Sequence, residues 1–354
     1  MTRKFISLIA AACGMLSLGN TVQAQTMGPD LMDRIAVHGF IQGGYTFAEK
    51  NGVKTNSFDM KRAIVWMDAD ITPRWSFRFM HDFSSSVQEY FTDVRLTNDN
   101  MLNVRFGQFK NAFSIENGLA PFLAETIDLC AEGVTYLAGC GSDPLYGVSA
   151  GRDLGLAVFG ETDDKFFRYE LNVLNGTGIN RKDRNNSKDV IGRLEFRPVN
   201  GLNIVATGQI GYGNALVGPT VFNPLMVIGQ DYRRNRYSIG ANYRTDGLGI
   251  HSEFVSGYDR DVESLGAYVT GFKTLCKTKN GNALDLVASY DYFDFNTSLD
   301  LDMHKAVLGL QYWFFKGCRL QMQYVYKSAI TDYRTVFNKI GNHALMCQVQ
   351  VKFN

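Results

Sequence analysis

Hydrophobic and polar residues alternate with a period of two along most of this chain. In residues 166–174 (FFRYELNVL), every second residue from Phe167 to Val173 is aromatic or aliphatic, and the residues between them are polar. A period of two is that of a β-strand, whose successive side chains point to opposite sides. Helical spacing of apolar residues is almost absent after residue 25.

Sixteen segments carry this alternation, and we predict that each is a strand. They are residues 35–47, 57–70, 75–83, 90–97, 102–110, 154–160, 166–174, 188–197, 202–212, 232–244, 248–258, 265–276, 284–293, 303–314, 318–327 and 342–353. Short, turn-like connections such as RPVNG and RTDG alternate along the chain with longer ones. The longer set is predicted at 48–56, 84–89, 111–153, 175–187, 213–231, 259–264, 294–302 and 328–341.

An even number of amphipathic strands joined alternately by short and long connections is typical of a transmembrane barrel. Hydrocarbon offers the backbone no hydrogen-bond partner, so a spanning sheet must close on itself. We therefore predict an all-β fold, a transmembrane antiparallel β-barrel of about 16 strands and of the outer-membrane porin type. The alternative is a secreted soluble β-sandwich, which shares the strands and turns but does not require the alternation of short and long connections.

The first residues have the features of a secretory signal peptide. Two basic residues precede an apolar stretch from Phe5 to Leu18, and the residues VQA place small side chains before a cut at Gln25. We predict a signal peptide at residues 1–24 and a single barrel domain at residues 25–354. The expected location is the outer membrane of a Gram-negative bacterium.

Charge and hydropathy exclude other classes. The chain has 36 Lys+Arg and 35 Asp+Glu, and removal of the signal peptide leaves a net charge of −1. A nucleic-acid binder or an acidic disordered chain would need a strong charge excess, so we expect no nucleic-acid partner. A mean hydropathy of −0.14, with no apolar run near the length of a membrane helix after the N-terminus, excludes a polytopic helical membrane protein.

Cysteine and histidine residues offer little chemistry. Cys130 and Cys140 lie close together in the stretch CAEGVTYLAGC and are candidates for a disulfide in an oxidising compartment. No CxxC or HExxH motif indicates a metal, and the five histidines are scattered, with no nucleophile motif such as GxSxG. We predict no metal, no cofactor and no catalytic residue, so the chain is not expected to be an enzyme.

The longest connection, residues 111–153, is the candidate constriction of the pore. It combines polar and acidic residues with apolar ones that can pack against an inner wall. The candidate constriction residues are Glu116, Asn117, Glu125, Asp128 and Glu132. The alternative is that this loop caps the barrel from outside and never enters the lumen.

Basic residues dominate the predicted lumen face, which carries twelve basic and eight acidic side chains when it is taken from the alternation in each strand. The candidate pore-lining residues are Arg62, Arg78, Arg95, Arg105, Arg168, Arg193, Arg234, Arg236, Lys305 and Arg319. Rows of Arg or Lys in a narrow aqueous pore favour anions. The alternative is that neighbouring charges pair across strands and only keep the wall hydrated.

Several stretches of the chain have a family resemblance. The run VRFGQFKNAFSIENG at 104–118 is followed by GRDLGLAVFG at 151–160, YELNVLNGTG at 169–178, DVIGRLEFRP at 189–198, NYRTDGLGIHSEFVSG at 242–257 and ASYDYFD at 288–294. In this order they resemble the phosphate-selective porin O and P family. The resemblance implies a sixteen-stranded trimeric porin whose loops fold into the pore and which passes small anions.

These observations together predict an outer-membrane porin for the passive diffusion of small hydrophilic solutes or ions, with inorganic anions such as phosphate as candidate solutes. The expected partners are outer-membrane lipid, the solutes and further copies of the chain in a homotrimer. The alternative function is a surface-exposed barrel that binds a partner through its long loops without conducting.

Overall fold

The computed structural model describes residues 33–50, 52–140, 142–143, 147–148, 150–299, 301–328 and 342–353. The predicted signal peptide and most of the predicted connection at 328–341 lie outside the described residues.

Within the described residues, sixteen strands form the wall of one barrel. They are β1 (Ile35–Lys50), β2 (Val53–Thr72), β3 (Trp75–Asp82), β4 (Val87–Arg95), β5 (Asn103–Lys110), β8 (Arg152–Glu161), β9 (Phe167–Leu174), β10 (Asp189–Val199), β11 (Leu202–Asn214), β12 (Asp231–Thr245), β13 (Leu248–Asp259), β14 (Val262–Lys277), β15 (Ala283–Asp294), β16 (Asp302–Phe315), β17 (Cys318–Lys327) and β18 (Asn342–Phe353). Each strand lies on one of the predicted segments, so the predicted barrel fold is confirmed.

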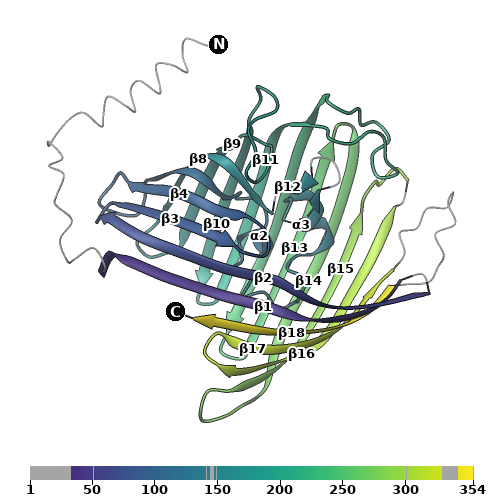
Figure 1. Cartoon of the computed structure of the whole chain (residues 1–354). Coiled ribbons are helices and arrows are strands. Elements are labelled where there is room, and N and C mark those ends of the chain that lie inside the picture. Colours follow the sequence, from purple (N-terminus) through teal and green to yellow (C-terminus); the bar gives the residue numbers. More distant parts are fainter. Residues whose placement is uncertain are drawn as a thin grey trace. The chain divides into compact units, whose positions relative to one another are not determined.

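The sheet closes where the first strand meets the last (Figure 1). Neighbouring strands pair antiparallel, and the closing register runs from Gly39 opposite Phe353 to Glu49 opposite His343. β5 pairs directly with β8, because the chain between them leaves the wall. Closure of this kind leaves no strand edge exposed in the wall.

The predicted alternation of short and long connections holds only in part. The long connections predicted at 48–56 and 259–264 are wrong, because only residues 51–52 separate β1 from β2 and only residues 260–261 separate β13 from β14. The strands continue beyond their predicted ends, and the chain then reverses in a tight turn. Arg260 has a φ of 61°, a conformation found mostly in such turns.

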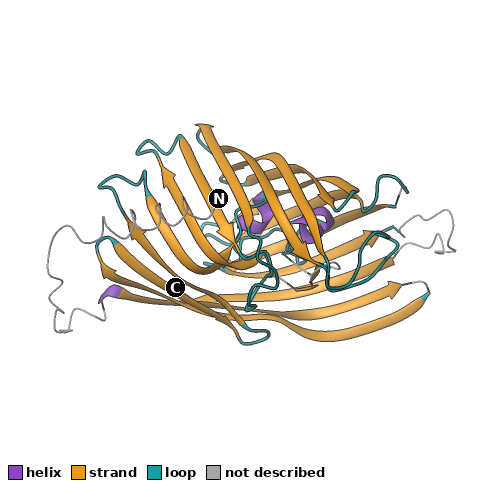
Figure 2. Ribbon diagram, turned by 90° about the horizontal axis from the view of Figure 1, so that it is seen from above, coloured by secondary structure: helices purple, strands orange, loops and turns teal. Residues whose placement is uncertain are grey.

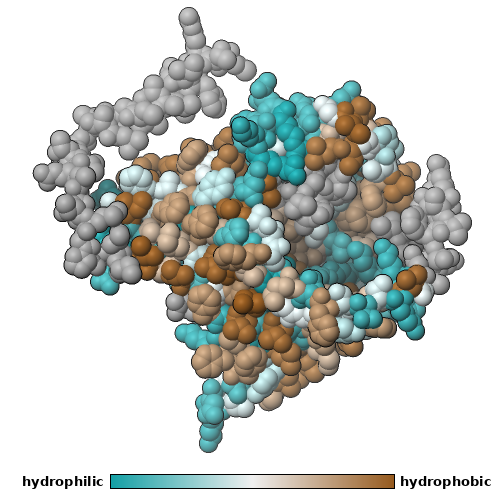
Figure 3. Space-filling view, in the orientation of Figure 1, coloured by the Kyte–Doolittle hydropathy of each residue, from teal (hydrophilic) through white to brown (hydrophobic). Residues whose placement is uncertain are grey.

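The two faces of the wall differ in polarity, as a period of two requires. Along β12, Tyr237 and Ile239 are exposed on the outside, whereas Arg234, Arg236 and Ser238 are buried on the inside. Figure 3 shows hydrophobic side chains gathered on the outer flank over β16–β18. An apolar outer face and a polar inner face suit a wall between lipid and water. In the described part of the chain, no helix is long and apolar enough to cross a membrane.

Residues 111–151, between β5 and β8, form what we call the inner loop. It contains the helices α2 (Ile115–Gly118) and α3 (Glu132–Leu137) and a short ladder of β6 (Ser142–Asp143) with β7 (Gly147–Val148). Both helices lie within the ring of strands (Figure 2). α3 packs against β13, β14 and β15, and Val134 and Leu137 join Val255 and Phe293 of the wall in a large buried apolar cluster.

We predict that Ile239→Arg destabilises the barrel by about 2–4 kcal/mol, because a charge then replaces an apolar side chain on the outer face in the middle of β12. The control is Ile228→Arg, at an exposed position between β11 and β12, which should change the free energy of unfolding by less than about 0.5 kcal/mol. Guanidinium unfolding of protein refolded in lipid vesicles measures both. Equal effects would contradict the assignment of the outer face to lipid.

Candidate functional site

The inner loop is closed at its base by a hydrogen-bonded clasp. Asn117 Nδ2 donates to the backbone oxygens of Asn111 at 3.0 Å and Gly151 at 3.2 Å, and Asn111 N donates to Gly151 O at 2.9 Å. Gly151 has a φ of 66°, and a Cβ there would lie 1.8 Å from Asn117 Oδ1, so only glycine fits. The clasp joins the two ends of the loop where β5 and β8 pair.

A buried carboxylate of the wall holds the start of α2. Glu253 of β13 accepts hydrogen bonds from Ser114 Oγ at 2.7 Å, Ile115 N at 3.1 Å and Tyr268 Oη at 3.0 Å. These four residues are all buried. Ser114 has a φ of 72°, which is unfavourable for a residue other than glycine. The contacts with Glu253 therefore hold the loop in a conformation that it would not adopt alone.

The first two acidic candidate residues of the inner loop are also engaged with the wall or with the loop itself. Glu116 accepts a hydrogen bond from Ala131 N at 2.6 Å, and its other oxygen lies 3.1 Å from His251 Nε2. Glu125 lies 3.2 Å from Arg244 Nη1 of β12. Both carboxyl groups are buried.

The other two acidic candidate residues bind lysines of the wall. Lys305 Nζ lies 3.7 Å from Asp128 and 3.5 Å from Glu132, while Lys61 contacts Asp128 and Lys327 contacts Glu132. Burial raises the pKa of Asp128, but Lys305 and Lys61 outweigh this and hold the pKa below its usual value. All four acidic candidate residues thus lie beside a cationic or backbone partner, and the Asp128 side chain keeps 46% of its surface exposed. Their role as a constriction stays a prediction.

Four of the ten predicted pore-lining residues are covered. They are Arg234, Arg236, Lys305 and Arg319, all less than a tenth exposed. Arg319 Nη2 donates to Ala124 O of the inner loop at 2.7 Å, and Arg236 Nη1 donates to Leu137 O. Arg234 is held in the same way by the connection after β9. The alternation places these side chains inside the barrel, but the segments folded over them separate them from open space.

Three adjoining cavities lie along the part of the wall formed by β2–β5 and β8–β10 in the described structure, with volumes of about 510, 300 and 220 Å³. We call the space that they outline the passage. The middle, largest cavity shares Arg168 with the cavity at the short-turn end and shares Lys110 and Arg152 with the cavity at the loop end. The six other predicted pore-lining residues all line this passage: Arg62, Arg78, Arg95, Arg105, Arg168 and Arg193.

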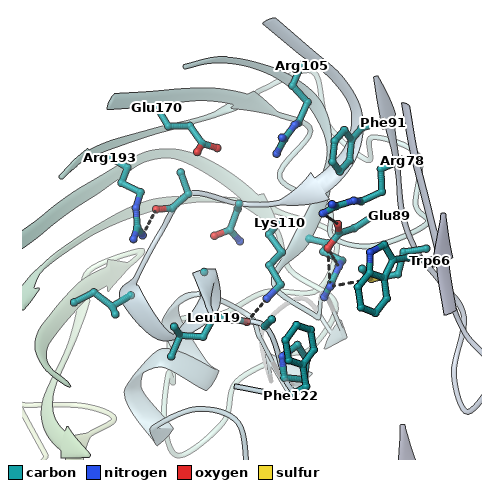
Figure 4. Close-up of a pocket in the computed structure, with 18 of the residues that line it drawn as sticks. Trp66, Arg78, Glu89, Phe91, Arg105, Lys110, Leu119, Phe122, Glu170 and Arg193 are labelled. Carbon is teal, nitrogen blue, oxygen red and sulfur yellow. Dashed lines mark hydrogen bonds and ion pairs between the residues drawn. The ribbon is translucent and has the colours of Figure 1, made fainter. Parts of the chain in front are cut away.

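Basic side chains outnumber acidic ones in the largest cavity. Among the described residues its lining includes Arg78, Arg105, Lys110, Arg152, Arg168 and Arg193 against Glu89, Glu170 and Glu195. Five of these six cations lie close to a carboxylate, as in the two-hydrogen-bond pair of Arg105 with Asp93 at 2.7 and 2.8 Å. Lys110 has no described carboxylate within 4 Å, and its Nζ donates to Leu119 O at 2.5 Å. Figure 4 shows Lys110 pointing into the cavity.

Part of the same cavity is apolar. The Phe122 ring stacks on Trp66, with centroids 6.0 Å apart and planes 2° from parallel, and Met80, Leu119 and Pro121 also line the space. Both aromatic rings are visible beside Lys110 in Figure 4.

Sequence reasoning missed these contacts for two reasons. Trp66 and Met80 have the same strand parity as Arg62 and Arg78, so the alternation does place them on the lumen face, but an apolar residue there carries no charge to mark it as a candidate. Lys110 is the last residue of β5, where strict alternation predicts the outer face. The chain turns into the barrel at this point, and the turn redirects the side chain.

The two cysteines that are candidates for a disulfide lie close together in the inner loop. Cys130 and Cys140 are free thiols, and a hydrogen bond joins their side chains in place of a covalent bond. That hydrogen bond and burial raise the pKa of the Cys130 thiol well above its usual value, which disfavours the reactive thiolate. No group of three His, Cys, Asp or Glu side chains within the described ranges is arranged to bind a metal.

Comparison with known proteins identifies the fold. No protein-family model matches the sequence, and no curated protein is similar to it. Among solved structures, an anion-selective porin from Comamonas acidovorans matches 90% of this chain and 99% of its own at a TM-score of 0.63 and 11% identity. OprB of Pseudomonas putida matches 92% of this chain and 96% of its own, at a TM-score of 0.62 and 12% sequence identity. A loop-deletion mutant of OmpT, an outer membrane protein of Vibrio cholerae, matches 90% of this chain and 99% of its own, at a TM-score of 0.62 and 15% sequence identity. Identities this low establish a shared barrel fold.

We predict that Glu253→Ala lowers the free energy of unfolding by about 1–3 kcal/mol, because Ser114 Oγ, Ile115 N and Tyr268 Oη then lose a buried acceptor. The control is Ser252→Ala on the outer face of the same strand, where one hydrogen bond to Tyr268 O is lost. It should cost about 1 kcal/mol or less. Guanidinium unfolding followed by tryptophan fluorescence compares them, and a smaller loss for Glu253→Ala would show that the anchor is dispensable.

Proposed function

We propose that this chain is an outer-membrane porin through which small hydrophilic solutes diffuse passively, with a preference for anions. The observation that supports the proposal is the passage beside the inner loop, whose largest cavity carries more basic than acidic side chains. Transport through it needs no chemical step and no cofactor, because pore width and wall charge decide which solutes pass.

The location follows from the two faces of the wall. The outer face is apolar and would be solvated by lipid, whereas the inner face is polar and charged. A closed sheet satisfies its backbone hydrogen bonds within the wall, which is the condition for crossing hydrocarbon. We therefore propose insertion in the outer membrane, the compartment to which a cleaved signal peptide would deliver the chain.

The preference for anions depends on how the charges are paired. The carboxylates of the inner loop are bound by lysines, by a histidine or by backbone amides, so they oppose an entering anion only weakly. Lys110 has no ion-pair partner among the described residues and lies where two cavities join. The resemblance to the phosphate-selective porins O and P adds phosphate to the candidate solutes.

Single-channel recording in planar bilayers under a salt gradient tests the function. Stable conductance steps with a reversal potential directed toward the anion are expected from the refolded mature chain. A folded barrel that gives no steps would favour the alternative of a surface barrel that binds a partner through its loops. A chain that high salt extracts from membranes would favour a soluble β-protein.

We also propose that the chain assembles as a homotrimer, as the resemblance implies. One of the structural matches, OmpT of Vibrio cholerae, is described in a trimer form. Light scattering of the detergent-purified protein, corrected for bound detergent, should give three times the mass of the mature chain. A mass of one chain would contradict the proposal.

We predict that Lys110→Glu lowers the ratio of anion to cation permeability by at least about fivefold, because a unit charge at about 4 Å in water is worth about 1 kcal/mol. The matched control is Lys188→Glu, the same change at an exposed loop residue that does not line the passage. The reversal potential under a potassium chloride gradient measures both variants. Equal shifts in the two variants would show that Lys110 does not face the permeating ions.

A further inference from the structure

An apolar strip lies beside the basic residues of the largest cavity. It consists of Met80, Leu119, Ala120, Pro121 and Phe122, which are partly exposed. Trp66 stacks behind Phe122, and Phe40 and Ile64 are buried behind them at 2% and 4% exposure. The strip is thus the open surface of a packed aromatic cluster.

Such a strip does not interact favourably with inorganic ions. Water gains little from contact with apolar side chains, and a chloride or phosphate ion has no apolar surface to place against them. A solute with a ring or an alkyl chain would cover the strip and release that water. About half of the residues that line this cavity are apolar, and they lie beside the charged ones. Sites for small organic molecules combine an apolar surface with charges placed beside it in this way.

The cations and the strip lie within the length of one small solute. Lys110 Nζ donates to the backbone oxygen of Leu119 at 2.5 Å, so this charge is at the first residue of the strip. Arg152 Nη2 lies 3.9 Å from Met80 Sδ, at another point of the strip. Figure 4 shows Lys110 between Glu170 and Arg193 on one side and Trp66 and Phe122 on the other.

We infer that the passage selects amphipathic organic anions, carboxylates that carry an aromatic or alkyl body. This inference rests on the proposed porin function and names its solute class. The carboxylate is held near Lys110, where a cation lacks an ion-pair partner in the described structure, and the apolar body lies against Leu119, which is next to this cation, and against Phe122. A cavity of about 510 Å³ has room for a phenyl ring with a short acidic chain. Binding must stay weak, since a solute held tightly would block the pore.

Current block in planar bilayers tests the inference with two probes that share a carboxylate and differ by a ring, propionate and 3-phenylpropionate. The half-blocking concentration of 3-phenylpropionate for the potassium chloride current should be about tenfold lower, as expected for covering one face of a phenyl ring. The neutral amide of 3-phenylpropionate should block far less than the acid. Equal half-blocking concentrations for the two acids would overturn the inference.

Variants separate the two parts of the site. Leu119→Asn should remove most of the tenfold difference while leaving the propionate value unchanged, and Phe122→Leu should reduce it less, because an apolar surface remains. Lys110→Gln should raise the half-blocking concentrations of both acids, because both lose the cation that holds the carboxylate. The control is Leu123→Asn, on the same loop but outside the lining of the three cavities, and it should change neither. A loss of discrimination in the control as large as in Leu119→Asn would contradict the assignment of the strip.

A second readout keeps this inference distinct from the proposed function. Binding of 3-phenylpropionate beside Trp66 should change the tryptophan fluorescence of the detergent-solubilised protein, and propionate should not. A barrel that shows this change but does not conduct would overturn the porin function and leave the ligand class standing. A barrel that conducts with an anion preference but shows neither the fluorescence change nor the tenfold difference would overturn only the ligand class.

Discussion

Closure of the sheet by the pairing of β1 with β18 is the constraint on which the rest of this structure depends. A wall that faces hydrocarbon must satisfy every backbone hydrogen bond within itself, so it has no free edge. Because strand side chains alternate, a closed wall sends half of them into an enclosed lumen, where they contact water or whatever segment fills it. Sixteen strands enclose more space than their side chains fill. The segment that fills this space therefore decides how much of the lumen stays open.

The inner loop fills the lumen unevenly, because it is bound to one part of the wall. Its contacts lie mainly on β12–β18, where Glu253 holds α2, Arg319 holds Ala124 O, and Gln321 and Gln323 donate to Glu125 O at 3.0 and 2.8 Å. Buried charges are tolerated only when they are paired, so the loop's carboxylates lie where the wall supplies partners. The passage is left beside β2–β5 and β8–β10, and its lining keeps an excess of cations.

The wall could be predicted from the sequence strand by strand, whereas the passage could not. Alternation is a local property, and it located β17 and β18 at their observed bounds. It also assigned Arg319 to the inside, but whether an inward side chain meets water or the inner loop depends on contacts between residues far apart in the chain. Arg319 and Ala124 are 195 positions apart. For Lys110 the alternation predicted the outer face, because it holds only within a strand. The strand ends at Lys110, and the side chain follows the loop inward.

The basic passage and the apolar strip have one physical cause. The mature chain has a net charge of −1, and the inner loop is acidic, so composition alone would argue against an anion pathway. A segment that crosses an aqueous lumen has two faces, and the face bound to a charged wall takes the polar residues. When Glu125, Asp128 and Glu132 turn to the wall, the loop withdraws negative charge from the passage. The face left toward the passage at residues 119–122 is apolar, and it stands beside the cation that no loop carboxylate reaches. The proposed preference for anions and the proposed binding of an apolar solute body thus have the same structural origin, which is the loop face that contacts the wall.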